Sequence, residues 1–275
     1  SVFTWAYICL SYSDAQSILP TCNCTVDAGK DIEICEPGGT VKLNGSVTGA
    51  FISFNWKDEP ELSDLFTLKP DATVSLDKTF TLTTKCKSNT FVPIINGNFS
   101  NGNTGFTTGY IYDAVPGSFG PGKITVTNNP QSFNSGFGAC GDHTTGSGNM
   151  LLVDGSTTPN TDIWCQNVTL QPNTDYLFEF WVTNMYPVSP ANLLITCNGI
   201  PVGTYTPDPD MCLWQKVSIC FTPVATSNVS MCISEVSGVG FGNDFAIDDI
   251  SLQEVCRYED KVNVKVLPNK TTIVD

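Results

Sequence analysis

Two stretches of sequence, TFTLTTKC at residues 79–86 and YEDKVNVKVLP at residues 258–268, decide the expected fold. In each, apolar side chains alternate with polar ones, which is the pattern of a half-buried β-strand. Phe80 and Leu82 share one face of the first stretch, and Val262 and Val264 share one face of the second. We therefore expect two strands that each bury one face in a core.

Shorter alternating runs precede the first of these strands. TVKLNGSV at residues 40–47 and FISFNW at residues 51–56 are bounded by residues that favour turns. Short strands at roughly ten-residue spacing indicate a β-sandwich. Trp56, with Cys35 before it and Cys86 after it, has the order of an immunoglobulin-like core. The sequence therefore predicts an all-β chain whose first domain is an Ig-like β-sandwich.

The run DAGKDIEICEPGG, followed by FISFNW and TFTLTTKC, resembles the PKD-like and Ig-like modules of type IX-secreted bacterial surface proteins. Such modules close with one further strand, and its counterpart here is residues 258–268. The resemblance implies that residues 22–86 and 256–275 form one discontinuous domain. Residues 87–255 would then be inserted in its last hairpin, a place where insertions are tolerated when the inserted ends lie close together.

The insertion begins with FVPIINGNFSNGNTGF at residues 91–106 and closes with NDFAIDDISL at residues 243–252. These ends resemble carbohydrate-binding modules with a galactose-binding-like jelly-roll fold. The resemblance implies a jelly-roll β-sandwich, binding of a glycan, and a structural calcium ion between the opening turn and the closing strand. Alternation predicts the inward-facing residues Tyr176, Phe178, Phe180, Val182, Leu193, Ile195, Cys197, Val217, Ile219, Phe221, Val229, Met231 and Ile233.

Calcium prefers six to eight oxygen ligands. The resemblance places candidate ligands at both ends of the insertion: Asn98, Ser100, Asn103, Asp248 and Asp249. Ser100 stands where the family usually has Glu, and Asn98 where Asp is common, which weakens a site for a hard cation. The alternative is that the two aspartates only accept hydrogen bonds. Because neighbouring strand residues point to opposite faces, they are not expected to act as a pair.

Aromatic faces that stack on sugar rings are the second candidate feature. Five aromatic residues near loops or strand ends are the candidates for glycan binding: Tyr110, Tyr112, Trp164, Tyr186 and Trp214. Each has packing in the core or at its rim as the alternative role. Trp181, within an apolar strand, is expected to be structural. The loop at residues 140–149, with His143, is expected to be a surface loop tied down by Cys140.

Twelve cysteines and one histidine favour disulfides over zinc ligation, and so indicate an oxidising compartment. Proximity in sequence favours Cys140–Cys165, Cys197–Cys212 and Cys220–Cys232. Two partners stay open for Cys86, namely Cys256 and Cys35.

Residues 1–21 begin with a strongly apolar segment. Val2, Phe3, Trp5, Tyr7 and Ile8 are good strand formers on both faces. Three interpretations stay open: a strand packed in its own domain, a strand donated to a neighbouring molecule, and the tail of a signal peptide.

Composition and motifs exclude several classes of function. The formal net charge of −14 repels nucleic acid and anionic lipid. No apolar run is long enough for a membrane span, and no common hydrolase or nucleotide-binding motif is present. We therefore expect a non-catalytic adhesion protein, extracellular or at the cell surface, that binds a glycan or surface polysaccharide. The alternative is a structural subunit of an extracellular filament or sheath assembled by donation of the N-terminal strand.

Overall fold

The computed structural model describes residues 22–35, 37–224 and 227–267. Across these residues it contains β-strands, turns and one short 3₁₀ segment, η1 (Pro130–Ser132), which confirms the expected all-β class. No helix in the described part of the chain is long and apolar enough to cross a membrane. The proposed assembly strand lies outside the described residues.

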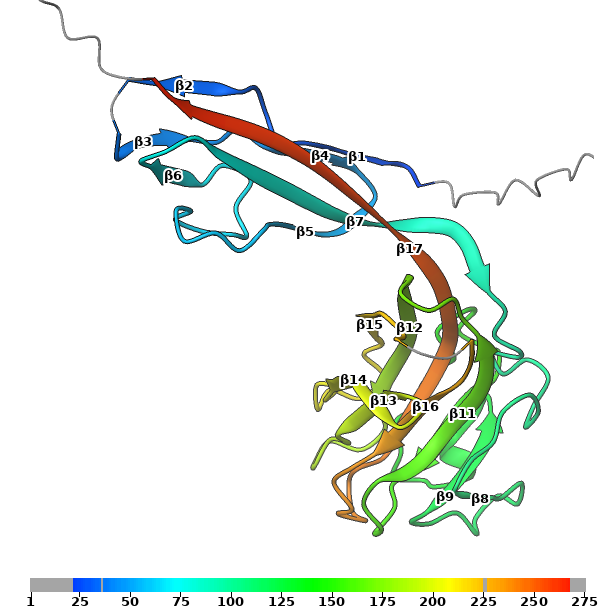
Figure 1. Cartoon of the computed structure of the whole chain (residues 1–275). Helices are drawn as coiled ribbons and strands as arrows, with labels where there is room; N and C mark the ends of the chain where they lie inside the picture. The colour runs from blue at the N-terminus through cyan, green and yellow to red at the C-terminus, as the bar shows by residue number, and fades with distance from the viewer. Residues whose placement is uncertain (1–21, 36, 225–226, 268–275) are drawn as a thin grey trace, which may run out of the picture.

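The outer domain, residues 22–86 and 256–267, is a small Ig-like sandwich (Figure 1). Its strands are β1 (Cys24–Asp27), β2 (Ile32–Ile34), β3 (Gly39–Lys42), β4 (Ser46–Gly49), β5 (Phe51–Trp56), β6 (Asp71–Val74), the first part of β7 (Lys78–Val92) and the last part of β17 (Phe245–Val266). β7 pairs with both β5 and β17, while β1 pairs with β4 and β3 with β6. Trp56 is fully buried in the core, and its Nε1 donates to the Thr67 carbonyl at 3.0 Å.

Two long strands, β7 and β17, connect the outer domain to the inserted module (Figure 1). They pair antiparallel over their shared length, with Cys86 opposite Cys256 and Phe80 opposite Val262. The pairing that the sequence predicts for these distant segments is confirmed. Because strand residues alternate between faces, Phe80 and Leu82 point into the same core as Val262.

The inserted module, residues 87–255, is a jelly-roll β-sandwich. Its strands are β8 (Ile111–Tyr112), β9 (Lys123–Thr127), β10 (Met150–Asp154), β11 (Thr161–Thr169), β12 (Asp175–Asn184), β13 (Leu193–Cys197), β14 (Ile200–Tyr205), β15 (Gln215–Phe221) and β16 (Asn228–Glu235), completed by β17. One sheet has the order β15-β12-β17-β10-β9-β8 and the other β11-β16-β13-β14. The residues predicted to face inward lie in the core between them, with Ile219 at its edge.

A second apolar layer covers the outer face of the larger sheet. Met150 and Leu152 on β10 and Ala246 on β17 point away from the main core, yet all are fully buried. Phe137 and Cys140, from the long segment between β9 and β10, pack over them. β10 is therefore buried on both faces, which explains its continuous apolar sequence MLLVD.

The cysteine pairing differs from every expected pair. The described disulfides are Cys22–Cys256, Cys24–Cys86, Cys140–Cys212 and Cys165–Cys232, and the free thiols are Cys35, Cys197 and Cys220. Both Cys86–Cys256 and Cys35–Cys86 are therefore wrong, because β1 supplies a partner to the paired strands. Cys220–Cys232, Cys197–Cys212 and Cys140–Cys165 are wrong as well. Cys220 and Cys232 lie on strands of different sheets, and Cys140 and Cys212 lie in loops that meet on the outer face of the larger sheet.

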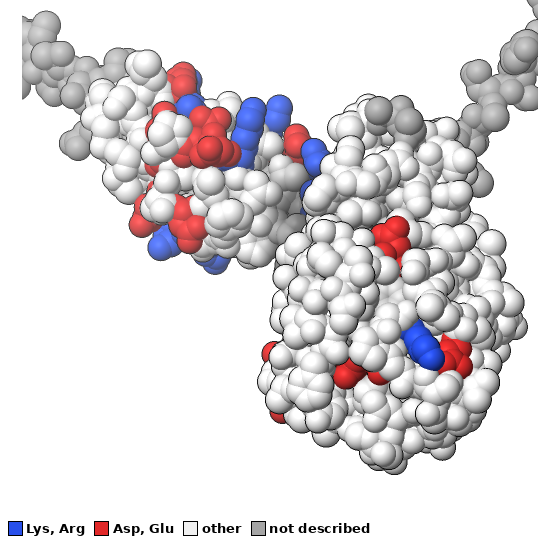
Figure 2. Space-filling model, turned by 90° about the horizontal axis from the view of Figure 1, so that it is seen from below, with Lys and Arg blue, Asp and Glu red and all other residues white. Residues whose placement is uncertain are grey.

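Charged side chains are unevenly distributed over the surface. Figure 2 shows Lys, Arg, Asp and Glu close together on the outer domain, and few charges on the same view of the inserted module. The inserted module therefore presents a mostly uncharged polar and apolar surface on that side.

Candidate functional site

A β-bulge in β17 determines the geometry of the candidate site. Glu179 on β12 lies opposite Ser251, but Trp181 lies opposite Asp248, so β17 carries one extra residue. Asp249 occupies this bulge with a φ of 49°, a left-handed conformation that Asp tolerates better than most residues. The extra residue breaks the strict alternation of side chains along the strand.

Both aspartates consequently contact the loop at residues 140–149. The Asp248 Oδ2 accepts from the His143 backbone N–H at 3.0 Å, and the Asp249 Oδ2 lies 2.7 Å from the His143 Nδ1. The Thr144 hydroxyl donates to the Asp249 Oδ1 at 2.6 Å. The expectation that the two carboxylates face opposite sides is therefore wrong.

The carboxyl group of Asp248 is perturbed by its surroundings. Burial, followed by the nearby charge of Asp249, raises the pKa of Asp248 to about 6, although backbone N–H donors act in the opposite direction. Asp142, in the same loop, behaves differently. Burial opposes its ionisation, but hydrogen bonds from Gly148 and Thr145 outweigh it and keep the pKa of Asp142 below the ordinary value.

The loop also supports an aromatic group on the outer face of the larger sheet. The imidazole of His143 stacks on Trp181 with ring centroids 3.7 Å apart and planes 16° apart. Trp214 meets His143 edge-on, and its Nε1 donates to the Gly141 carbonyl at 3.1 Å. The Cys140–Cys212 disulfide fastens this loop to the segment that precedes β15. The prediction that Cys140 ties the loop down is confirmed.

Trp181 lines a cleft of about 460 Å³ between the sheet and the opening turn of the module. We call it the Trp181 cleft. Its lining combines an indole, amides, a carboxylate pair and an amine: Ile94, Asn96, Gly97, Asn98, Asn101, Glu179, Trp181, Lys216, Asp249, Ile250 and Ser251. Trp181, expected to be only structural, is therefore the aromatic residue that sequence reasoning missed. The signal was its place in strand alternation, one position out of phase with the inward-facing Phe180 and Val182.

Ion pairs fix the polar floor of the Trp181 cleft. The Lys87 and Lys216 amines lie 2.8 Å and 3.1 Å from the Glu179 carboxylate. The Ser218 hydroxyl also donates to Glu179, at 2.8 Å. Burial raises the pKa of Glu179, but these partners outweigh burial and lower it overall. Glu179 is therefore an ionised, fully paired group that orients neighbouring amines.

The opening turn approaches the bulge closely because it contains a glycine. A Cβ added at Gly97 would lie 2.2 Å from the Ile250 carbonyl oxygen, and the Ile250 N–H donates to the Gly97 carbonyl at 2.9 Å. The Asn96 amide donates to the Gly102 and Thr104 carbonyls at 2.8 Å and 2.9 Å. The NGNF motif therefore closes the cleft by holding the turn against β17.

The five predicted glycan-binding aromatics are not brought together. Trp164 is fully buried in the main core, and Tyr110 is buried with its hydroxyl accepting from the Ser156 N–H at 3.2 Å. Neither has a free ring face, so the prediction is wrong for both. Tyr112 is exposed on β8 outside the cleft, Tyr186 lines a different pocket, and Trp214 packs beside His143.

The predicted calcium ligands do not come together as one set either. Asp248 is turned toward the loop at residues 140–149, while Ser100 and Asn103 are exposed and outside the lining of the Trp181 cleft. Asp249 and Asn98 share that cleft, but both Asp249 oxygens already have partners. These residues fit a calcium site poorly, and calcium binding stays a prediction.

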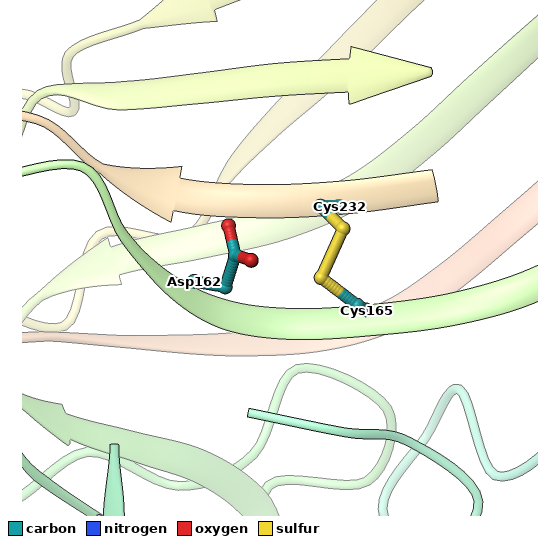
Figure 3. A group of neighbouring side chains, drawn as sticks. All are labelled: Asp162, Cys165 and Cys232. Atoms are coloured by element: carbon teal, nitrogen blue, oxygen red, sulfur yellow. A yellow bond between two sulfur atoms is a disulfide. The ribbon is translucent and has the colours of Figure 1, made fainter. Parts of the chain in front are cut away.

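Asp162, Cys165 and Cys232 form the one His/Cys/Asp/Glu group of metal-binding dimensions in the described part of the chain (Figure 3). Their two sulfurs form a disulfide, so neither is a thiolate ligand. Asp162 accepts a hydrogen bond from the Ser234 hydroxyl at 2.6 Å. The group is therefore a structural cross-link between β11 and β16.

Comparisons with known proteins show similarity of structure and not of sequence. No family model matches the chain, and no curated protein matches it. A Stig cyclase from Fischerella sp. TAU shares 12% identity, with 60% of this chain and 97% of the cyclase covered and a TM-score of 0.45. The CBM22-1 xylan-binding domain of Paenibacillus barcinonensis Xyn10C shares 13% identity, covering 57% and 91% of the two chains with a TM-score of 0.40. A Family 16 Carbohydrate Binding Module-2 shares 19% identity, covering 58% and 97% with a TM-score of 0.36.

Proposed function

We propose that this protein is an extracellular, non-catalytic binding protein that holds a glycan in the Trp181 cleft. The observation that carries the proposal is the lining of that cleft. It combines an indole with the side chains of Asn98, Asn101 and Lys216 in about 460 Å³. Sugar recognition needs an aromatic face for the CH groups of the ring and oriented polar groups for its hydroxyls.

The state of the carboxylates supports binding over catalysis at this cleft. Glu179 is neutralised by two lysines, and Asp249 is engaged by His143 and Thr144. Glycoside hydrolysis requires one carboxyl group that is free to donate a proton and a second that acts as nucleophile or base. Neither carboxylate of the cleft is free for such a role.

Four disulfides in the described residues support an oxidising location. With the outer Ig-like domain as a connector, the inserted module would present the cleft for adhesion to a surface polysaccharide. This part of the proposal is tested by labelling intact cells with an antibody to the outer domain.

The cleft is tested with the full chain on a glycan array, followed by calorimetric titration of the best ligand. Replacing Trp181 by Ala removes the stacking surface, so affinity is expected to fall at least about ten-fold, equivalent to about 1.4 kcal/mol. Because Trp181 also packs on His143, a second variant, Asn101→Ala, tests the cleft without disturbing that stack. It is expected to weaken binding as well.

Tyr112→Ala is the matched control, since Tyr112 is an exposed aromatic residue outside the cleft. It is expected to bind the ligand as the unaltered protein does. Undiminished binding by both cleft variants, or loss of binding in the Tyr112 variant, would place the glycan site elsewhere.

A further inference from the structure

A second cavity lies where β10 ends and β17 begins. Its volume is about 350 Å³, and it shares no lining residue with the Trp181 cleft. The carboxyl groups of Asp154 and Asp244 line it together with the rings of Tyr186, Phe241 and Phe119. We call it the Asp154 pocket.

The register of the sheet brings the two carboxyl groups together. β10 and β17 are antiparallel with Val153 opposite Phe245, so the next residues, Asp154 and Asp244, are neighbours across the strands. Their exposed fractions are only 6% and 7%. The two carboxyl groups are within hydrogen-bonding reach of each other. Two acidic groups are thus held side by side and largely away from water.

No cation of the described residues forms an ion pair with Asp154 or Asp244. The contrast with Glu179 is direct, because that buried carboxylate is paired with both Lys87 and Lys216. A buried charge without a partner is costly. The pair therefore lacks the counter-charge that the protein supplies elsewhere.

The surroundings of the pair raise its proton affinity. Burial, followed by the charge of Asp244, raises the pKa of Asp154 to about 7, and burial also raises the pKa of Asp244. Lys123 on β9 acts in the opposite direction, but its amine is bonded to Asp113 at 2.7 Å. Tyr110 is near the pair as well, and burial, followed by the charge of Glu235 and then those of Asp154 and Asp244, raises the pKa of its hydroxyl.

A further acceptor lies beside the pair. Asn243 is fully buried, and within the described chain its Oδ1 has no hydrogen-bond partner. Its amide lies against Gly155, where a Cβ would come within 2.0 Å of the Asn243 Cγ. The Gly155 N–H itself donates to the Asp244 Oδ1 at 3.1 Å. A buried amide oxygen without a partner within the described residues therefore belongs to the residue next to Asp244 in the chain.

Aromatic rings form the outer wall of the Asp154 pocket. Tyr186 and Phe241 meet edge-on with centroids 5.5 Å apart, and 65% of Phe241 is exposed. An ammonium group within about 6 Å of a ring centroid is attracted to the ring face. Carboxylates at the base and rings at the rim are the two features that hold an organic cation.

We propose that the Asp154 pocket binds a primary ammonium group, with Asp154 and Asp244 as counter-charge and Tyr186 and Phe241 as the aromatic wall. The ammonium is carried by an amino sugar or by a lysine side chain, which share this chemistry. The site is independent of glycan binding in the Trp181 cleft, since the two share no residue.

The test is calorimetric titration of the full chain with two amines and their uncharged counterparts. The amines are glucosamine and Nα-acetyl-lysine amide, and the counterparts are N-acetylglucosamine and diacetyl-lysine amide. At least one amine is expected to bind at least ten-fold more tightly than its acetylated form. The amine that binds more tightly identifies the source of the ammonium group.

Binding is also expected to depend on pH in a defined direction. A carboxyl group with a pKa of about 7 goes from about one-tenth ionised at pH 6 to about nine-tenths at pH 8. The lysine amine stays charged throughout, since its pKa is about 10.4. Affinity for the lysine probe is therefore expected to rise about ten-fold over this interval.

The variant Asp154→Asn/Asp244→Asn keeps the volume of both side chains and removes the charge, so it is expected to weaken amine binding at least ten-fold. Tyr112→Ala, which alters an exposed ring outside both cavities, is expected to leave amine binding unchanged. Equal binding of amines and acetylated probes by the unaltered protein would overturn the proposal, whether or not the double variant folds. Calcium binding that the double variant abolishes, without amine binding, would also overturn it and assign a metal site instead.

Discussion

At the scale of single residues, three buried carboxyl groups of the inserted module differ in the direction of their pKa shifts: Asp142, Asp154 and Asp248. Asp154 and Asp248 both titrate near neutrality, for reasons of burial and neighbouring charge. Asp142 is equally buried, but backbone donors keep it ionised. What separates these residues is the neighbouring charge: Asp244 and Asp249 add to the effect of burial on Asp154 and Asp248, whereas hydrogen bonds outweigh burial at Asp142.

The raised pKa of Asp154 predicts a pH-dependent stability of known sign. Its pKa is about 7 in the folded protein against 3.8 as an ordinary value, so the folded form binds more protons between these limits. Stability is therefore lost as pH rises from about 4 to about 7. Asp154→Asn is expected to remove this loss and to stabilise the module at pH 8 by on the order of 2–4 kcal/mol. Scanning calorimetry between pH 4.5 and 8 measures the effect.

Asp210→Asn is the control for this experiment, since it removes one negative charge from an exposed position. It is expected to leave the pH dependence of the transition temperature unchanged. If both variants flatten the curve equally, the cause is the overall charge of −14 and not the buried pair.

Trp181 and Leu152 illustrate how much of the site could be predicted from the sequence alone. Alternation in EFWV places Phe180 inside and Trp181 outside, and this much was available from the pattern. An outward residue is usable for binding only if nothing covers it. Leu152 is also outward on the same sheet, yet a distant segment buries it. Such coverage depends on contacts between segments far apart in the chain, so periodicity could not show it.

At the scale of strands, the shared ladder of β7 and β17 organises the outer domain. Two disulfides join the ladder to β1 and its preceding residues, through Cys24–Cys86 and Cys22–Cys256. Cys86 and Cys256 are directly opposite in register but are not bonded to each other. Each instead anchors a residue of the incoming chain.

The Cys22–Cys256 disulfide is expected to stabilise the outer domain by closing a very long loop. Its partners are 234 residues apart in sequence. Cross-links of long loops restrict the unfolded chain most, so replacing both cysteines by Ser is expected to cost about 3–5 kcal/mol. Chemical denaturation of the oxidised protein measures the change.

Cys35→Ser serves as the comparison, because Cys35 is an exposed free thiol. Its stability is expected to match that of the unaltered protein. A loss in this variant similar to that of the double serine variant would show that Cys35 takes part in an alternative pairing.

The cysteine pairs and the bulge mark the limit of prediction from strand patterns. Cys220 and Cys232 lie on strands consecutive in sequence, but β16 pairs with β11 and β13 and not with β15. The register of β11 and β16 sets Cys165 opposite Cys232. Likewise, nothing in IDDIS shows that Asp249 adopts a positive φ. Strand identity was predictable, while neighbours and irregularities follow from the assembled sheets.

Across the whole molecule, the apolar residues form separate cores in the two domains. Trp56 belongs to the outer core and Trp164 to the core of the inserted module. Two strands, β7 and β17, continue from one domain to the other, but among the described residues no hydrophobic cluster is shared between the domains. The domains are therefore expected to unfold in distinguishable steps.

Tryptophan substitutions test this separation. Trp56→Phe is expected to lower only the transition of the outer domain, by about 2–3 kcal/mol, because it also leaves the Thr67 carbonyl unpaired. Trp164→Phe is expected to lower only the other transition, and by less, since within the described residues its Nε1 has no partner to lose. Calorimetry assigns each loss to a transition. A single transition that both substitutions lower would show that the domains unfold together.

The Cys22–Cys256 cross-link has a mechanical consequence for a protein under tension. A pull applied at residues 22 and 267 passes from Cys22 through the sulfur bridge to Cys256 and leaves along the last strand. The residues between these cysteines, including the inserted module, do not carry the applied force. Shear or flow on the chain ends would therefore stretch only a short terminal ribbon, and the module would keep its shape until the bridge is reduced.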